Sequence, residues 1–310
     1  WRYLIGSVIV IIATVIGQVP LGIVVALKAL RDGIGMSNID EQTMYSLLES
    51  NLFLFLMLLS FAFGMIGLVL VVKYLHKQTM LSVTTSRKKI DWKRIWFAFV
   101  LWGSITSGFV ILGYYMSPED YVYNFQPGRF ALLVVIVIAL IPIQTSLEEY
   151  IFRGYLMQGF GMLAKNKWFP LIITSVIFGG LHFFNPEVKT LGYGIMVYYI
   201  GTGLFWGIIT LMDEGMELSL GFHAANNLFT ALLVTTDWTA LQTHSILKDI
   251  SEPSLGFSDL IVPVFILYPI LLYVLARIYK WSDWKDKLLG KVAELPREDY
   301  KVLDEIGTLK

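Results

Sequence analysis

The sequence predicts an all-α, polytopic integral membrane protein with about eight transmembrane helices around a central helical core. Apolar residues make up 56% of the 310 residues and charged residues only 15%, whereas soluble domains carry about 45–50% and about 25%. The mean hydropathy is +0.65. The charged residues are clustered, with long apolar stretches between them. We therefore expect residues 1–280 to form a single transmembrane domain rather than several soluble ones.

Eight stretches approach the length of about 20 mostly apolar residues that a transmembrane helix needs. Their approximate bounds are Tyr3–Leu27, Leu52–Tyr74, Ile95–Met116, Phe130–Phe152, Phe169–Phe184, Leu191–Met212, Leu218–Thr235 and Leu260–Tyr279. The fifth and seventh are short for a full span. The polar motifs described below fall between about residues 130 and 235, which we take as the central core.

The loop charges predict an orientation, because cytoplasmic loops are enriched in Lys and Arg. Basic residues follow the second and the last stretch: Lys73, Lys77, Arg87, Lys88, Lys89, Lys93, Arg94, Lys280, Lys285, Lys287, Lys291 and Arg297. Acidic residues follow the first and third: Asp32, Asp40, Glu41, Glu49, Glu119 and Asp120. This alternation predicts cytoplasmic N- and C-termini.

The segment 281–310 has the pattern of an amphipathic cytoplasmic tail. Leu288, Val292 and Leu295 recur at i, i+4 and i+7 among charged residues, after Trp281 and Trp284. Such a helix lies along a membrane surface. A solvated charged tail is the alternative that the pattern leaves open.

Ionisable residues inside a bilayer are costly and mark functional sites by default. Three predicted spans carry them in short motifs: Glu148-Glu149 followed by Arg153, Phe178 followed by His182, and His223 followed by Asn227. The chain has no cysteine, which excludes disulfides, thiolate nucleophiles and cysteine-ligated metals.

Helical spacing assigns roles to the two glutamates. Glu149 and Arg153 are four residues apart and can form an ion pair on one helix face. Glu148 is displaced by about 100° around the axis, so it can face another partner. Of two adjacent carboxyl groups, the one without a cation is the better proton acceptor near neutral pH. Glu148 is therefore the candidate general base.

The two histidines and Asn227 are candidate hydrogen-bonding groups of the site. His223 and Asn227 are four residues apart on one face and can both donate hydrogen bonds to a developing oxyanion. His182, on another helix, can hold a water against Glu148. If the fifth span enters the membrane from the cytoplasmic side at Lys167, His182 should lie about 22 Å from the cytoplasmic face and His223 about 8–9 Å from it. Straight spans would therefore separate the two histidines.

Other residues in or near these motifs have simpler expected roles. Phe178 is expected to pack beside the site, and Gly179 and Gly180 to allow close helix approach. His76 and His244 fall in predicted loops and are expected to be solvated.

The three motifs in this order, each on its own hydrophobic helix, resemble the CPBP family, which includes type II CAAX prenyl endopeptidases and bacterial Abi proteins. The resemblance covers about residues 130–235. It implies an intramembrane glutamic endopeptidase of the CAAX-protease or bacteriocin-processing type. Glu148, assisted by His182, would activate water, and His223 and Asn227 would form the oxyanion hole. Glu149 would contribute to the site, with Arg153 and Phe178 in support.

The resemblance also implies the partners and the location. The expected substrate is a peptide or membrane protein, with or without a lipid group, in the bacterial cytoplasmic membrane. We expect no cofactor and no nucleic-acid partner.

Two other interpretations of the same residues stay open. A zinc-dependent intramembrane metalloprotease would use Glu148, His182 and His223 as ligands. A non-proteolytic membrane scaffold or transporter would use the polar cavity without hydrolysis, although transporters often show internal repeats, and none is found.

Overall fold

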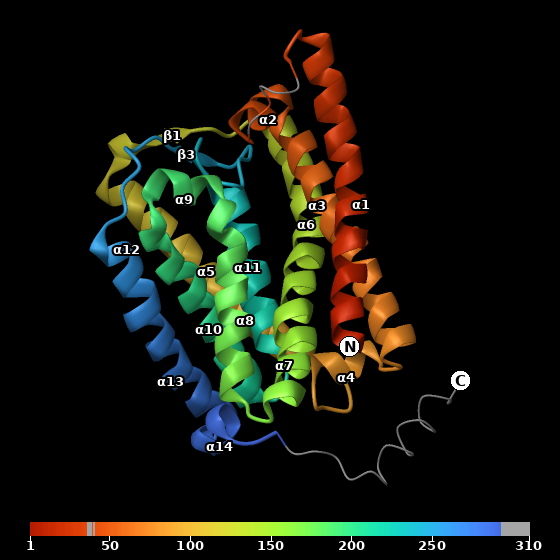
Figure 1. Cartoon of the computed structure of the whole chain (residues 1–310). Helices are drawn as coiled ribbons and strands as arrows, with labels where there is room; N and C mark the ends of the chain where they lie inside the picture. The colour runs from red at the N-terminus through yellow and green to blue at the C-terminus, as the bar shows by residue number, and fades with distance from the viewer. Residues whose placement is uncertain (36–38, 40, 293–310) are drawn as a thin grey trace.

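The computed structural model describes residues 1–35, 39 and 41–292, and they form a bundle of long helices (Figure 1). The long elements are α1 (Arg2–Arg31), α3 (Ser50–Leu70), α5 (Trp92–Met116), α6 (Pro127–Glu149), α8 (Trp168–Leu181), α10 (Met196–Asp213), α11 (Glu217–Leu233) and α13 (Tyr268–Tyr279). The shorter α-helices are α2 (Glu41–Leu47), α4 (Met80–Thr84), α7 (Met157–Ala164), α9 (Pro186–Leu191), α12 (Phe257–Ile261) and α14 (Trp284–Leu289). The predicted all-α, polytopic membrane fold is confirmed.

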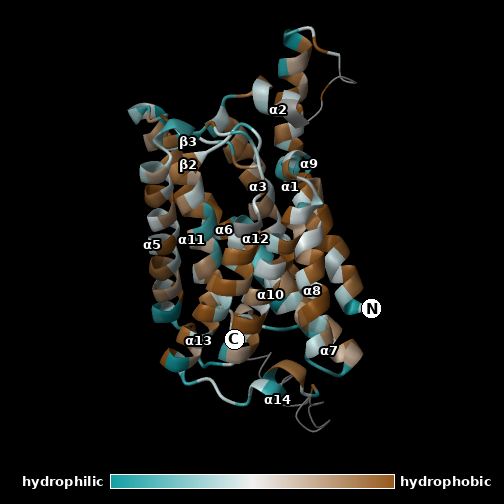
Figure 2. Ribbon diagram, turned by 90° about the vertical axis from the view of Figure 1, so that its left-hand side faces the viewer, coloured by the Kyte–Doolittle hydropathy of each residue, from teal (hydrophilic) through white to brown (hydrophobic). Residues whose placement is uncertain are grey.

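Six helical segments within the described residues are long and apolar enough to cross a membrane. They are Arg2–Arg31, Ser50–Leu75, Trp92–Met116, Pro127–Ala164, Tyr193–Asp213 and Asp259–Tyr279. The fifth and seventh predicted stretches correspond to α8 and α11, which are not among these six segments. Figure 2 shows hydrophobic residues along the helices and hydrophilic residues gathered at their ends.

The fourth span is longer than the sequence suggested. We expected it to end at Phe152, before Arg153, but α6 continues through the π-helix η4 (Tyr150–Leu156) into α7. The charge of Arg153 does not end the helix because its partner Glu149 lies on the same helix. A π-helical turn inside an α-helix is often found at functional sites, and this one directly follows the two glutamates.

Three short strands lie at the end of the bundle opposite the N-terminus (Figure 1). β1 (Tyr121–Tyr123) pairs antiparallel with β3 (Leu247–Asp249), which also pairs parallel with β2 (Val234–Thr235). The strands join the segment before α6 to the segment after α11. This small sheet ties together the ends of the two helices that carry the glutamates and His223.

The N-terminus, α4 and α14 all lie at the other end of the bundle (Figure 1). The described part of the predicted tail contains α14, and backbone hydrogen bonds connect Val292 and Gly290 to the turn between α7 and α8. Leu295 and Arg297 lie outside the described residues, as does Asp40 of the acidic loop. The amphipathic tail and the side of the membrane that each end faces stay predictions.

Candidate active site

Glu149 and Arg153 form a buried ion pair, as their spacing in the sequence predicted. Arg153 Nη1 lies 3.0 Å from Glu149 Oε1, and the two side chains are 1% and 0% exposed. Arg153 Nη2 also donates to the carbonyl oxygen of Gly203 in α10, at 2.9 Å. This second bond crosses to another helix, so the ion pair connects η4 to α10 as well as to α6.

Aromatic rings surround the guanidinium of Arg153. Its central carbon lies 4.5 Å from the ring centroid of Phe178 and 5.4 Å from that of Trp206. Cation–π contacts of this kind stabilise a cation that is removed from water. Phe178 is 3% exposed and therefore packs beside the site as expected. It also contacts the buried guanidinium of Arg153.

His223 lies between the two glutamates. Its Nδ1 is 2.9 Å from Glu149 Oε1, and its Nε2 is 3.5 Å from Glu148 Oε2. The imidazole stacks on Trp206 with ring centroids 4.0 Å apart, and His223 is 2% exposed. Sequence reasoning paired each motif within its own helix and missed this contact of one histidine with both carboxyl groups.

These contacts restrict where protons can be. Because Glu149 is ion-paired with Arg153, it accepts a hydrogen bond from His223 Nδ1, which therefore carries a proton. His223 Nε2 and Glu148 Oε2 then face each other across 3.5 Å. A proton shared across this contact would be either on Glu148 or on His223 Nε2. The second arrangement gives an ionised Glu148 beside an imidazolium.

Glu148 is the more accessible of the two glutamates, with 17% of its side chain exposed. Gln144, one helical turn earlier, donates from Nε2 to Glu148 Oε1 at 2.7 Å. Asn227 donates from Nδ2 to Gln144 Oε1 at 3.0 Å. Gln144 was missed at the sequence level, although its spacing of four residues from Glu148 was a usable signal.

His182 stays apart from the other histidine. Its Nδ1 hydrogen-bonds to the carbonyl oxygen of Phe178 at 2.9 Å, and its ring stacks on Tyr199 with centroids 4.3 Å apart. Within the described residues it makes no hydrogen bond to Glu148. The ring of Phe178 nevertheless lies between the two histidines, with its centroid 5.0 Å from the His182 imidazole and 6.0 Å from the His223 imidazole. The depths expected for His182 and His223 in the membrane stay predictions.

The remaining expectations have mixed outcomes. A Cβ on Gly179 would lie 2.5 Å from Ile200, so this glycine allows α8 to approach α10 closely, whereas a Cβ on Gly180 would meet nothing within 4 Å. The expectation for Gly180 was wrong. His76 and His244 are not simply solvated: His76 hydrogen-bonds to the hydroxyl of Tyr155 at 3.0 Å, and His244 lies 2.6 Å from a carboxylate oxygen of Glu49.

The residues do not fit the zinc site that Glu148, His182 and His223 were considered to form. The Nδ1 atom of His182 bonds to the carbonyl oxygen of Phe178 and its ring stacks on Tyr199, and among the described residues no hydrogen bond or ion pair joins His182 to Glu148 or His223. Among the described residues, no group of three or more His, Asp or Glu side chains is arranged to hold a metal ion.

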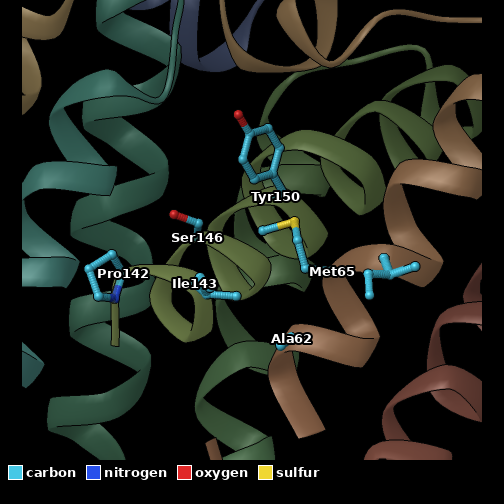
Figure 3. A pocket seen from close by; sticks show the side chains of 7 residues that line it. Ala62, Met65, Pro142, Ile143, Ser146 and Tyr150 are labelled. Atoms are coloured by element: carbon cyan, nitrogen blue, oxygen red, sulfur yellow. The ribbon is translucent and has the colours of Figure 1, made fainter. Parts of the chain in front are cut away.

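An apolar groove of about 530 Å³ lies between α3 and α6 (Figure 3). It is lined by Ala62, Met65, Ile66, Pro142, Ile143, Ser146 and Tyr150. On a helix, the groove residues of α6 lie on a different face from Gln144 and Glu148, which contact α11. The groove therefore neighbours the helix that bears the site without containing the candidate base.

Comparison with known proteins agrees with this geometry. The model of the family described as type II CAAX prenyl endopeptidase Rce1-like matches residues 127–229, which contain every motif residue named above. The uncharacterized protein YyaK of Bacillus subtilis (strain 168) is 30% identical over 236 residues, covering 76% of this chain and 78% of that protein. No solved structure matches the chain significantly. The chain therefore belongs to the Rce1-like family of type II CAAX prenyl endopeptidases.

Proposed function

We propose that the protein is an intramembrane glutamic endopeptidase of the CAAX-protease and bacteriocin-processing type, in which Glu148 activates water. Membership of a peptidase family, in a chain with several membrane-spanning helices, supports an intramembrane protease. The position of Glu148 is the observation that supports a glutamic mechanism with this residue as the general base. Its carboxylate is held by Gln144, faces His223 Nε2, and is the partly exposed acid of an otherwise buried cluster.

In this proposal, the proton shared by Glu148 and His223 meets the requirements of hydrolysis. When Glu148 is ionised, it can accept a proton from water, and the shared proton is then on His223 Nε2. The state with a competent base is thus also the state in which His223 can donate to an oxyanion. Glu149 keeps the imidazole in this orientation because it binds Nδ1, as the acid partner of a catalytic histidine does in other hydrolases.

The reaction then follows from these positions. Glu148 removes a proton from water as the water oxygen attacks the scissile carbonyl carbon, and the carbonyl electron pair moves to the oxygen. His223 and Asn227 donate hydrogen bonds to that oxyanion, where preorganised donors have their largest effect. Collapse of the tetrahedral intermediate breaks the C–N bond, and Glu148 returns the proton to the leaving amine. In this proposal His182 orients the water from the opposite end of the site.

We further propose that the substrate is a peptide or membrane protein of the bacterial cytoplasmic membrane, with or without a lipid group. Both termini of the protease would face the cytoplasm, because the basic loops would then lie inside. The site would act on peptide bonds that enter the helical bundle from within the bilayer or from its surface.

A comparison of cellular peptides tests the function. Membranes from cells that carry wild-type protein, Glu148→Gln or the control Glu119→Gln are analysed by quantitative mass spectrometry. Glu119 is exposed in the loop between α5 and α6, so the control changes one carboxyl group away from the site. We expect the same uncleaved proteins to accumulate in cells with Glu148→Gln and in cells without the protease, but not with Glu119→Gln. Identical cleavage patterns for wild type and Glu148→Gln would contradict the proposal.

A further inference from the structure

Five side chains from three helices form one continuous chain of hydrogen bonds that ends on Glu148. Trp102 Nε1 in α5 donates to Asn226 Oδ1 at 3.1 Å, and Asn226 Nδ2 donates to Asn227 Oδ1 at 3.1 Å. Asn227 Nδ2 donates to Gln144 Oε1 at 3.0 Å, and Gln144 Nε2 donates to Glu148 Oε1 at 2.7 Å. We call these five residues the amide chain.

Both ends of the amide chain fix its direction. The indole of Trp102 can only donate, and an ionised carboxylate such as Glu148 can only accept. Each of the three amides between them accepts on its oxygen and donates from its nitrogen. If the amides were all reversed, the oxygen of Gln144 would face the carboxylate of Glu148, and the nitrogen of Asn226 would face the N–H of Trp102. Only one direction satisfies every partner.

Burial strengthens the hydrogen bonds of the amide chain. Trp102 is 8% exposed and Gln144 is 9% exposed, so little water competes for their polar atoms. Hydrogen bonds in such surroundings are electrostatically stronger than in water, and connected ones polarise one another. The bond from Gln144 to an ionised carboxylate belongs to the stronger, charge-assisted class.

We propose that Gln144 is a positioning residue that couples the general base to the oxyanion donor, and that Trp102 sets the direction of the coupling through Asn226. This inference rests on the proposed function. Gln144 holds Glu148 Oε1, which leaves Oε2 directed toward His223. It also accepts one of the two N–H bonds of Asn227, which leaves the second for the oxyanion. One side chain thereby orients both groups that act on the reacting carbonyl.

Replacing Gln144 removes its hydrogen bonds with Glu148 and Asn227 and leaves the charged groups of the site in place. The other charged and titratable groups near this carboxyl are His223 of α11, Glu149 of α6 and Arg153 of η4. None of them is removed when Gln144 is replaced. A change in kcat on replacing Gln144 therefore reports the loss of these two hydrogen bonds.

The test compares Gln144→Leu with the control Thr145→Val in purified protein, using a synthetic fluorogenic form of a peptide that accumulates with Glu148→Gln. Thr145 is the adjacent buried residue, and its hydroxyl bonds only within α6. We expect Gln144→Leu to lower kcat by about 10-fold or more with KM nearly unchanged, as for an interaction that matters in the transition state. Thr145→Val should change neither.

A variant at the other end of the amide chain tests the proposed coupling. Trp102→Phe removes the indole N–H and should lower kcat in the same direction but less. Combined with Gln144→Leu, its effect should be less than additive, because the two residues act through one chain. Fully additive effects would overturn the role of Trp102.

Gln144→Glu keeps an acceptor for the side chain of Asn227. The pH dependence of its activity provides a second test if Gln144→Leu does not fold. A protonated Glu at this position can still donate to Glu148, but an ionised one repels it, so the alkaline limb should move to lower pH. An unchanged alkaline limb in Gln144→Glu would overturn the proposal, as would a Gln144→Leu variant with the kcat and KM of Thr145→Val. Activity in Glu148→Gln would instead refute the proposed function, so the two failures are distinguishable.

Discussion

The buried pair of Glu149 and Arg153 gives a sharp prediction, because its contribution to folding and its contribution to catalysis can be separated. Arg153→Met removes the cation and leaves Glu149 without its charge partner in a site where its side chain is 0% exposed. Breaking a buried ion pair on one side costs about 3–5 kcal/mol of unfolding free energy. Solvent screening gives no reason to reduce that figure, since both partners are buried. The lost bond to Gly203 and the lost ring contacts act in the same direction.

The double variant Glu149→Leu with Arg153→Met separates the two roles. Replacing both members of a buried pair by apolar residues is often neutral for stability, so the double variant should recover most of what Arg153→Met loses. It should stay inactive, because His223 Nδ1 no longer has the carboxylate that orients the ring. Stability restored without activity is the expected result.

Thermal unfolding and peptide cleavage are measured on the same detergent-purified samples of wild type, the single variant and the double variant. An Arg153→Met protein within about 1 kcal/mol of wild-type stability would refute the structural argument. A double variant with restored stability and near-normal kcat would refute the orienting role of Glu149.

Three further predictions follow from the loops and the site. A reporter fused after Lys88 should be cytoplasmic and one fused after Glu119 external; the same side for both would show that the orientation is wrong. Asn227→Ala should lower kcat by about 10²–10³ with little change in KM, whereas a variant that only melts earlier would exclude an oxyanion role. Although partial burial acts to raise it, hydrogen bonds from backbone N–H groups and from His244 hold the pKa of Glu49 below its ordinary value. The stability that this depressed pKa contributes is present above the ordinary pKa and lost as the pH falls through the depressed one. The difference in melting temperature between wild type and Glu49→Gln should therefore shrink on acidification, and a constant difference would contradict this.

Features that depend on spacing within one helix were predictable from the sequence. The ion pair of Glu149 and Arg153 follows from their separation of four residues, and the same rule places His223 and Asn227 on one face of α11. The bond between Gln144 and Glu148 has that spacing too. It was overlooked because an uncharged Gln in an apolar stretch draws less attention than a charged residue.

Features that depend on how helices pack were not predictable in this way. The position of His223 between two carboxyl groups requires α11 to approach α6 at one particular height and rotation. The bond from Trp102 to Asn226 depends on the packing of α5 against α11. The separation of His182 from Glu148 likewise follows from where α8 ends, so composition and periodicity along one chain segment do not determine it.

The most direct test of the central claim is the turnover of purified Glu148→Gln. The amide oxygen of Gln can still accept the bond from Gln144, so the fold and the amide chain should persist while the proton acceptor is lost. We predict an unchanged melting temperature and a kcat lower by about 10²-fold or more, the typical contribution of a general base. A folded Glu148→Gln protein that keeps more than about a tenth of the wild-type kcat would contradict the assignment of Glu148 as the base.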